Sequence, residues 1–188
     1  MMNGAVAQMR PAELERNTGM ATLIANDGDL DMLIEESLVS AAVNAVLAHE
    51  GVVRDVNVSV SFVDEDEMRG LNAAWRGIDA PTDVLSFECD SPFDDDVPDD
   101  EPIELGDVIL CPGVIASQAP EFENAPAEEC LLMLVHGMFH LLGYDHIDER
   151  GANEMEAGEL AVLRTLAVDR GLDPHSVRIG PTTRHLDD

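Results

Sequence analysis

The sequence has no lysine, one tryptophan and one tyrosine, and little positive charge of any kind. Ten arginines stand against 39 acidic residues, so the 188-residue chain carries a net charge of −29 at pH 7. A chain of that charge repels polyanions, which excludes broad, nonspecific binding to nucleic acids and predicts no interaction with DNA. Any site for RNA must draw its positive charge from a few local arginines.

Long apolar runs and a secretory leader are also missing. The longest unbroken apolar run near the middle is Leu131–Val135 with Cys130 in front, far short of the roughly 20 residues of a membrane span, so no membrane association is expected. Residues 1–17 carry charges and no apolar stretch, which predicts a cytoplasmic protein. Three cysteines without a C-x-x-C pair predict reduced, packed thiols.

The patterns that are present predict a single α+β domain over residues 21–172, because helices and strands interleave without a regular βαβ rhythm. Residues 1–20 are expected to form a flexible extension and residues 173–188 a loose tail. Within the domain, residues 88–104 hold nine acids, three prolines and no base, which is typical of a solvated loop. Periodicity predicts strands at 56–62, 84–87 and 106–111, and helices at 30–51, 64–74, 112–119, 126–142 and 151–168. Asp29 or Asp31 is the expected N-cap of the first helix.

Three histidines between residues 136 and 146 have a spacing typical of a catalytic metal site. His136 and His140 are four residues apart, so they share one face of a helix and both rings can reach a single ion. Gly143 can take the left-handed conformation that ends the helix, and the turn then returns His146 to the same ion. Three imidazoles leave the fourth position of a zinc ion for water, as in catalytic sites, although they also accept Ni, Co or Cu.

The spacing H-x-x-x-H-x-x-G-x-x-H is also that of the metzincin proteases, which place a glutamate directly after the first histidine as general base. In this chain that position is Gly137, which has no proton-transfer group. A metallopeptidase-like hydrolase is therefore an alternative whose ligand set fits but whose base is missing. Asp145 either orients one of the metal-ligating side chains by contacting it on the side away from the metal, or caps the turn; both interpretations stay open.

Three segments carry a close resemblance to the YbeY family of bacterial endoribonucleases, over roughly residues 50–170: LNAAWRGIDAPTDVLSFE (71–88), LGDVILC (105–111) and HGMFHLLGYDH (136–146). The resemblance implies one zincin-like domain, with a small mixed β-sheet, about five or six helices and the metal-binding helix at the centre. It also implies a zinc-dependent, single-strand-specific endoribonuclease, with one Zn²⁺ per chain, that acts in 16S rRNA 3′-end maturation, rRNA processing and ribosome quality control. The family's metal ligands map onto His136, His140 and His146, and its functional arginine maps onto Arg76.

Arg76 suits that role chemically. A planar guanidinium holds two phosphate oxygens at once and neutralises the charge that develops on a phosphoryl group during cleavage. The alternative is an ordinary turn residue that pairs with Asp79 or Asp83.

The chain departs from the family in having no lysine, so its attraction for RNA depends on a few arginines, of which Arg54, Arg69, Arg76 and Arg150 are the candidates. The acidic segment 88–104 lies between two matching motifs, where it either keeps RNA away or docks a basic partner. We therefore expect small-subunit ribosomal proteins and an assembly GTPase to recruit the chain to rRNA precursors. A non-catalytic ribosome assembly factor with a structural metal is the remaining alternative.

Overall fold

A four-stranded mixed sheet supports the fold in the computed structural model, which describes residues 21–93, 98 and 101–179. The strands are β1 (Ala21–Ala25), β2 (Val56–Phe62), β3 (Val84–Glu88) and β4 (Ile103–Leu110). Their order is β1-β2-β4-β3, with β1 and β4 parallel to β2 and β3 antiparallel to β4. In β2 the alternate valines and Phe62 are buried while the residues between them are only partly covered, because successive side chains point to opposite faces of a sheet.

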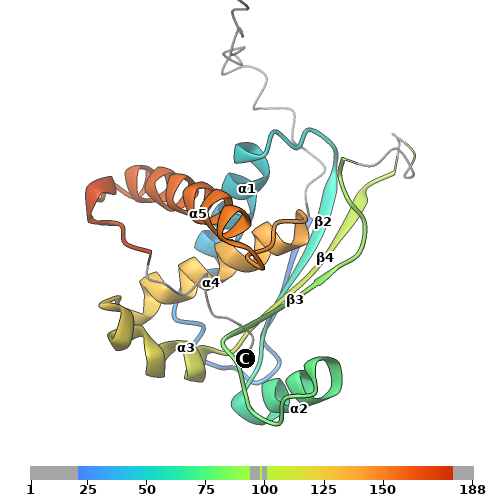
Figure 1. Cartoon of the computed structure of the whole chain (residues 1–188), viewed down its shortest axis with the longest axis vertical. Helices are drawn as coiled ribbons and strands as arrows, with labels where there is room; N and C mark the ends of the chain where they lie inside the picture. Colours follow the sequence, from blue (N-terminus) through green and yellow to red (C-terminus); the bar gives the residue numbers. More distant parts are fainter. Residues whose placement is uncertain (1–20, 94–97, 99–100, 180–188) are drawn as a thin grey trace, which may run out of the picture.

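Five α-helices accompany the sheet in this part of the chain: α1 (Glu36–His49), α2 (Glu65–Arg76), α3 (Pro112–Gln118), α4 (Pro126–Leu141) and α5 (Glu149–Asp169). Short 3-10 helices follow at Ala119–Phe122 and Pro174–Ser176. Helices α1, α4 and α5 gather on one side of the sheet, whereas α2 lies apart at its lower end (Figure 1). Helix α4 contacts α1, α3, α5, β3 and β4, so the mixed sheet and the central helix expected from the sequence are both present.

The core of the domain forms around α4. Its residues from Glu129 to Phe139 are all buried, which is the behaviour of a helix that is apolar on every side. A smaller apolar cluster lies under α2, where Met68, Leu85 and Cys111 are buried together with Val63. No helix in the described ranges has both the length and the apolar composition required to cross a bilayer.

The start of the first helix and the first strand differ from the sequence-based expectation. Helix α1 begins at Glu36 rather than near residue 30, and its N-cap is Glu35, without a side-chain cap. Asp31 instead accepts a hydrogen bond from the Leu33 amide, so it stabilises a tight turn and neither Asp31 nor Asp29 caps the helix. Strand β1 was not predicted at all, because its Leu23 points to solvent and breaks the expected apolar pattern.

Strand β4 begins at Ile103, inside the segment 88–104 that was predicted to be a loop, and Glu88 belongs to β3. The register of β4 against β2 shifts by one residue next to Gly106, which interrupts the alternation that marks a strand. Residues 94–97 and 99–100 of that segment, the predicted extension 1–20 and residues 180–188 of the predicted tail lie outside the described residues.

The beginning of the predicted tail packs against the domain, since Val177 and Ile179 lie against the main core. Among the cysteines, Cys111 and Cys130 are buried and free, as expected. Cys89 is exposed, so the prediction of a packed thiol is wrong there: it directly follows β3, where the chain leaves the sheet.

Gly106 provides a test of the β3–β4 pairing. Its φ is +133°, and a Cβ at this position would lie 2.1 Å from the carbonyl oxygen of Phe87. We expect Gly106→Ala to lower the free energy of unfolding by about 3 kcal/mol. The exposed Gly70 of α2 has open space around its Cα, so Gly70→Ala should raise it by about 0.5–1 kcal/mol. Urea unfolding of both variants checks this, and equal stabilities would contradict it.

Candidate metal centre

The metal-binding candidates lie where α4 ends and the chain turns back. Gly143 has a φ of +87°, and its amide donates to the carbonyl of His140 at 2.9 Å, the left-handed helix ending that the sequence predicts. The turn brings His146 beside the helix, with its ring centroid 5.3 Å from that of His136 and 5.1 Å from that of His140. One ring nitrogen from each of the three histidines lies within 4.8 Å of the others.

The hydrogen bonds of two rings determine where their lone pairs point. Nδ1 of His140 lies 2.9 Å from the backbone carbonyl of Tyr144, and a carbonyl only accepts, so Nδ1 carries the proton. Burial and the neighbouring histidines lower the pKa of His140 to about 4, so the ring is neutral at pH 7. Its Nε2 therefore presents a lone pair, and that atom lies 3.1 Å from Nε2 of His136.

His136 is oriented by a residue that the sequence-based reasoning missed. Its Nδ1 lies 2.8 Å from Oε1 of Glu159, a fully buried side chain of α5. When this carboxylate is ionised it accepts the Nδ1 proton, and Nε2 of His136 then has a free lone pair as well. The helical spacing could have identified it, because Glu159 follows Met155 by four residues and so lies on the buried side of α5.

These contacts fit a bound cation. When Glu159 is protonated, it donates to Nδ1 of His136, and Nε2 of His136 then donates to Nε2 of His140 at 3.1 Å. When Glu159 is ionised, both Nε2 atoms present lone pairs, which repel each other unless a positive charge lies between them. The separation is close to the edge of about 3.3 Å in a tetrahedron of Zn–N bonds of about 2.0–2.1 Å. The donor set of three imidazoles, two of them held through Nδ1, suits a divalent transition-metal ion.

Gly137 has a steric reason to lack a side chain. A Cβ on Gly137 would lie 2.7 Å from Cγ1 of Val108 and 3.0 Å from Oγ of Ser86. The helix thus packs directly onto β4 and β3 at the turn between His136 and His140. A glutamate has no room at this position, which accounts for the absent base and disfavours the metallopeptidase alternative.

The remaining predicted residues lie outside the histidine cluster. Arg76 is the last residue of α2 and is exposed. Asp145 is exposed and accepts a hydrogen bond from the Ile147 amide at 3.2 Å, so of its two interpretations the structure shows turn capping. Two other arginines are bound to carboxylates, Arg69 to Asp79 in a two-point contact and Arg150 to Glu154.

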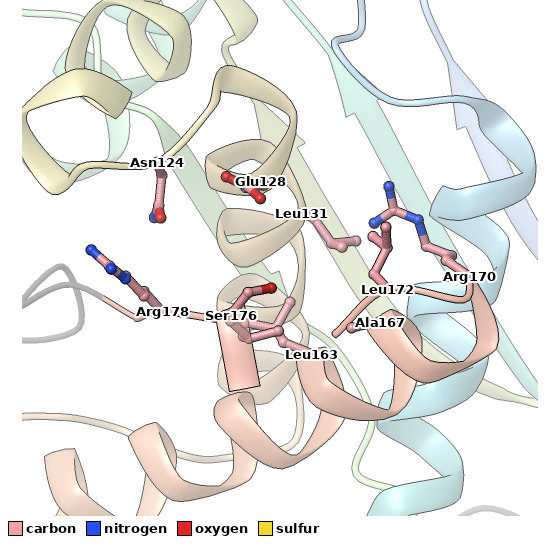
Figure 2. A pocket seen from close by; sticks show the side chains of 10 residues that line it. Asn124, Glu128, Leu131, Leu163, Ala167, Arg170, Leu172, Ser176 and Arg178 are labelled. Carbon is pink, nitrogen blue, oxygen red and sulfur yellow. The ribbon is translucent and has the colours of Figure 1, made fainter. Parts of the chain in front are cut away.

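The two described cavities lie away from the histidines. One, of about 60 Å³, lies between α4, α5 and the start of the C-terminal segment, with Leu131, Leu163 and Leu172 between Arg170 and Arg178 (Figure 2). The other, of about 110 Å³, lies near the ends of β1 and β2.

The buried Glu159 generates a prediction. Burial raises the pKa of its carboxyl to about 8, against an ordinary value of 4.5. In metal-free protein the folded state therefore keeps the proton while the unfolded chain releases it, so stability falls as the pH rises from 4.5 to 8. Glu159→Gln should abolish this contribution and also weaken zinc binding about 10- to 100-fold.

Thermal melts of wild type and Glu159→Gln in chelator between pH 4.5 and 8 test the pH dependence of stability, and zinc titrations of both proteins test the change in affinity. Glu154→Gln, at an exposed position of the same helix, serves as control and should behave as wild type. A Glu159→Gln variant with wild-type zinc affinity and the same pH dependence of melting would contradict the assignment.

Comparison with known proteins is consistent with this geometry. The family model described as Endoribonuclease YbeY matches residues 25–167. The Endoribonuclease YbeY of Alteromonas mediterranea is 42% identical over 130 residues, which cover 69% of this chain and 78% of the relative. That of Moorella thermoacetica is 37% identical over 151 residues, covering 77% and 97%, and that of Salinispora tropica is 39% identical over 150 residues, covering 77% and 94%.

The solution structure of TM1509 from Thermotoga maritima is similar in fold, with a TM-score of 0.56 and 31% sequence identity. The alignment covers 80% of this chain and 92% of that one. The α+β architecture expected from the sequence is therefore confirmed. On the family match, the identity to these relatives and the shared fold, the chain belongs to the YbeY family of endoribonucleases.

Proposed function

We propose that the chain is a zinc-dependent endoribonuclease that cuts single-stranded RNA, and that it acts in the cytoplasm on the 3′ end of 16S rRNA precursors and in ribosome quality control. The observation that carries the proposal is the convergence of His136, His140 and His146 in a chain of an endoribonuclease family. The finer assignments, namely zinc, the single-strand preference and the rRNA site, rest on the resemblance and on the chemistry of the donor set.

In this proposal, different side chains bind the metal ion and orient its ligands. His136, His140 and His146 would hold the ion. A zinc ion held there would polarise a phosphoryl oxygen and would lower the pKa of a coordinated water to about 7. Glu159 and the carbonyl of Tyr144 hold the Nδ1 protons of two rings, and so keep their Nε2 atoms directed at one point.

Arg76 would bind the phosphate group that is cut. Its guanidinium forms two parallel hydrogen bonds to phosphate oxygens and offsets the extra negative charge of the transition state. It is exposed at the end of α2, where it is accessible to a polymer substrate. Because Gly137 offers no base, the proton of the attacking hydroxyl or water has to pass to a group other than the side chain after His136.

Recruitment by partners complements this site. A net charge of −29 opposes encounter with RNA, whereas the acidic segment 88–104 attracts basic proteins. We propose small-subunit ribosomal proteins and an assembly GTPase as the partners that deliver the rRNA substrate.

Removal of one ligand tests the metal-centred reaction. His140→Ala should lower cleavage of a small-subunit rRNA precursor at least about 100-fold, and chelation of the wild type should do the same. His175→Ala, at an exposed histidine outside the cluster, should cut as wild type. If the wild type binds zinc but neither it nor the variants cut RNA, the non-catalytic assembly factor is the better account.

Replacement of Arg76 tests the phosphate-binding role. Arg76→Ala should keep wild-type zinc content yet lose about 100-fold in kcat/KM, because one stabilising contact to the transition state is removed. The kcat/KM of Arg76→Lys should lie between those of wild type and Arg76→Ala, since lysine keeps the charge but not the two-point geometry. Arg178→Ala removes the same charge beside the distant cavity of Figure 2 and should change little. Full activity of Arg76→Ala would rule out the role.

A further inference from the structure

The single tryptophan of the sequence is held with one side open to solvent. Trp75, in the last turn of α2, is 70% exposed. Its indole packs against the ring of Phe87 in β3, with centroids 5.3 Å apart and planes inclined by 60°. Phe87 in turn packs against the apolar cluster under α2. The indole is therefore positioned by the protein while most of its surface stays accessible.

Strand β3 separates this aromatic pair from the helix that carries His136 and His140. Strand β3 is the outer strand of the sheet, and no strand of the described residues pairs with its free edge. Phe87 follows Ser86 directly, so their side chains point to opposite faces. Ser86 Oγ lies beside Gly137, between His136 and His140 on α4. Phe87 and Trp75 therefore lie on the face of β3 opposite to α4 and its histidines, and the free edge of β3 lies between the two faces.

The charge of the chain favours an uncharged contact at this place. Phosphate contacts depend on cations. Arg76, the residue after Trp75, is proposed to bind the phosphate that is cut, and Arg69, six residues before Trp75 on α2, is bound to Asp79 through two hydrogen bonds. Stacking of a base on an aromatic ring needs no cation and tolerates any sequence. It also requires the base to be unpaired, because the faces of paired bases are covered by their neighbours in the helix.

We infer that Trp75, supported by Phe87, is a stacking site for an unpaired base of the RNA substrate next to the point of cleavage. The inference rests on the proposed function in that RNA is the ligand. It assigns part of the single-strand preference to this site, because a base inside a duplex cannot reach the indole. A neutral contact of this kind also gives the acidic chain affinity for RNA that salt does not screen.

The fluorescence of Trp75 reports on the site directly, because the chain has no other tryptophan. An unstructured ten-nucleotide RNA is titrated into the full-length protein in chelator, so that it stays intact, and the same RNA is added annealed to its complement. We expect the single strand to quench the emission and the duplex to leave it unchanged at equal concentration. Equal quenching by the two forms, or none by either, would overturn the inference.

Kinetics on the metal-loaded protein give the second test. Trp75→Ala should raise KM for the single-stranded RNA about tenfold, the effect of one lost stacking contact, with kcat within about twofold of wild type. Trp75→Phe retains an aromatic face, so its KM should stay within about threefold of the wild-type value. Leu23→Ala, at a 69% exposed side chain on the opposite edge of the sheet, is the matched control and should not change KM.

The outcomes separate this inference from the proposed function. The fluorescence titration needs no cleavage, so quenching by single strands would support the stacking site even if the metal-loaded protein did not cut RNA. If Trp75→Ala cuts naked RNA with wild-type KM while His140→Ala does not cut, the metal-centred function stands and the stacking site is wrong. Wild-type KM together with lost co-sedimentation with small ribosomal subunits would assign the face to a protein partner and overturn the inference.

Discussion

Two imidazole Nε2 atoms face each other at 3.1 Å at the end of a buried helix, and much of the surrounding structure serves to keep them there. The carbonyl oxygen of Tyr144 contacts Nδ1 of His140, and the carboxyl of Glu159 contacts Nδ1 of His136. When Glu159 is ionised, both Nε2 atoms present lone pairs to each other, and a shared cation would relieve their repulsion. The glycine that ends α4 then brings His146 to the same place.

The close contact of α4 with the sheet shapes the chemistry of the site. At Gly137 the helix lies against Val108 and Ser86 without space for a side chain, so a protein base cannot stand where the metzincin proteases have theirs. In the proposed mechanism, the catalytic groups are therefore a metal ion at the histidine cluster and Arg76 at the end of α2. The same contact sets the distance between the histidines and the outer strand β3.

The sequence contained enough information for the parts of the fold that obey local rules. The alternation in Val56–Phe62 marks a strand, and the spacing of His136 and His140 with Gly143 after them marks the helix, its end and the cluster. Other features depend on contacts between distant residues. Strand β1 forms because it pairs with β2 although Leu23 faces solvent, β4 is interrupted by a bulge, and the partner of His136 lies on another helix. The proposed role of Arg76 likewise cannot be read from local sequence, because Arg76 and the histidines lie on different elements.

The most direct test of the metal centre is long-range ¹H–¹⁵N NMR of the histidine side chains, recorded before and after one equivalent of Zn²⁺. We predict that His140 carries its proton on Nδ1 before and after zinc is added, and that zinc shifts the Nε2 resonances of His136 and His140 together with one nitrogen of His146. In the zinc-bound protein His136 should carry its proton on Nδ1, beside Glu159. Zinc-bound rings with the proton on Nε2, or Nε2 resonances that zinc leaves in place, would contradict this.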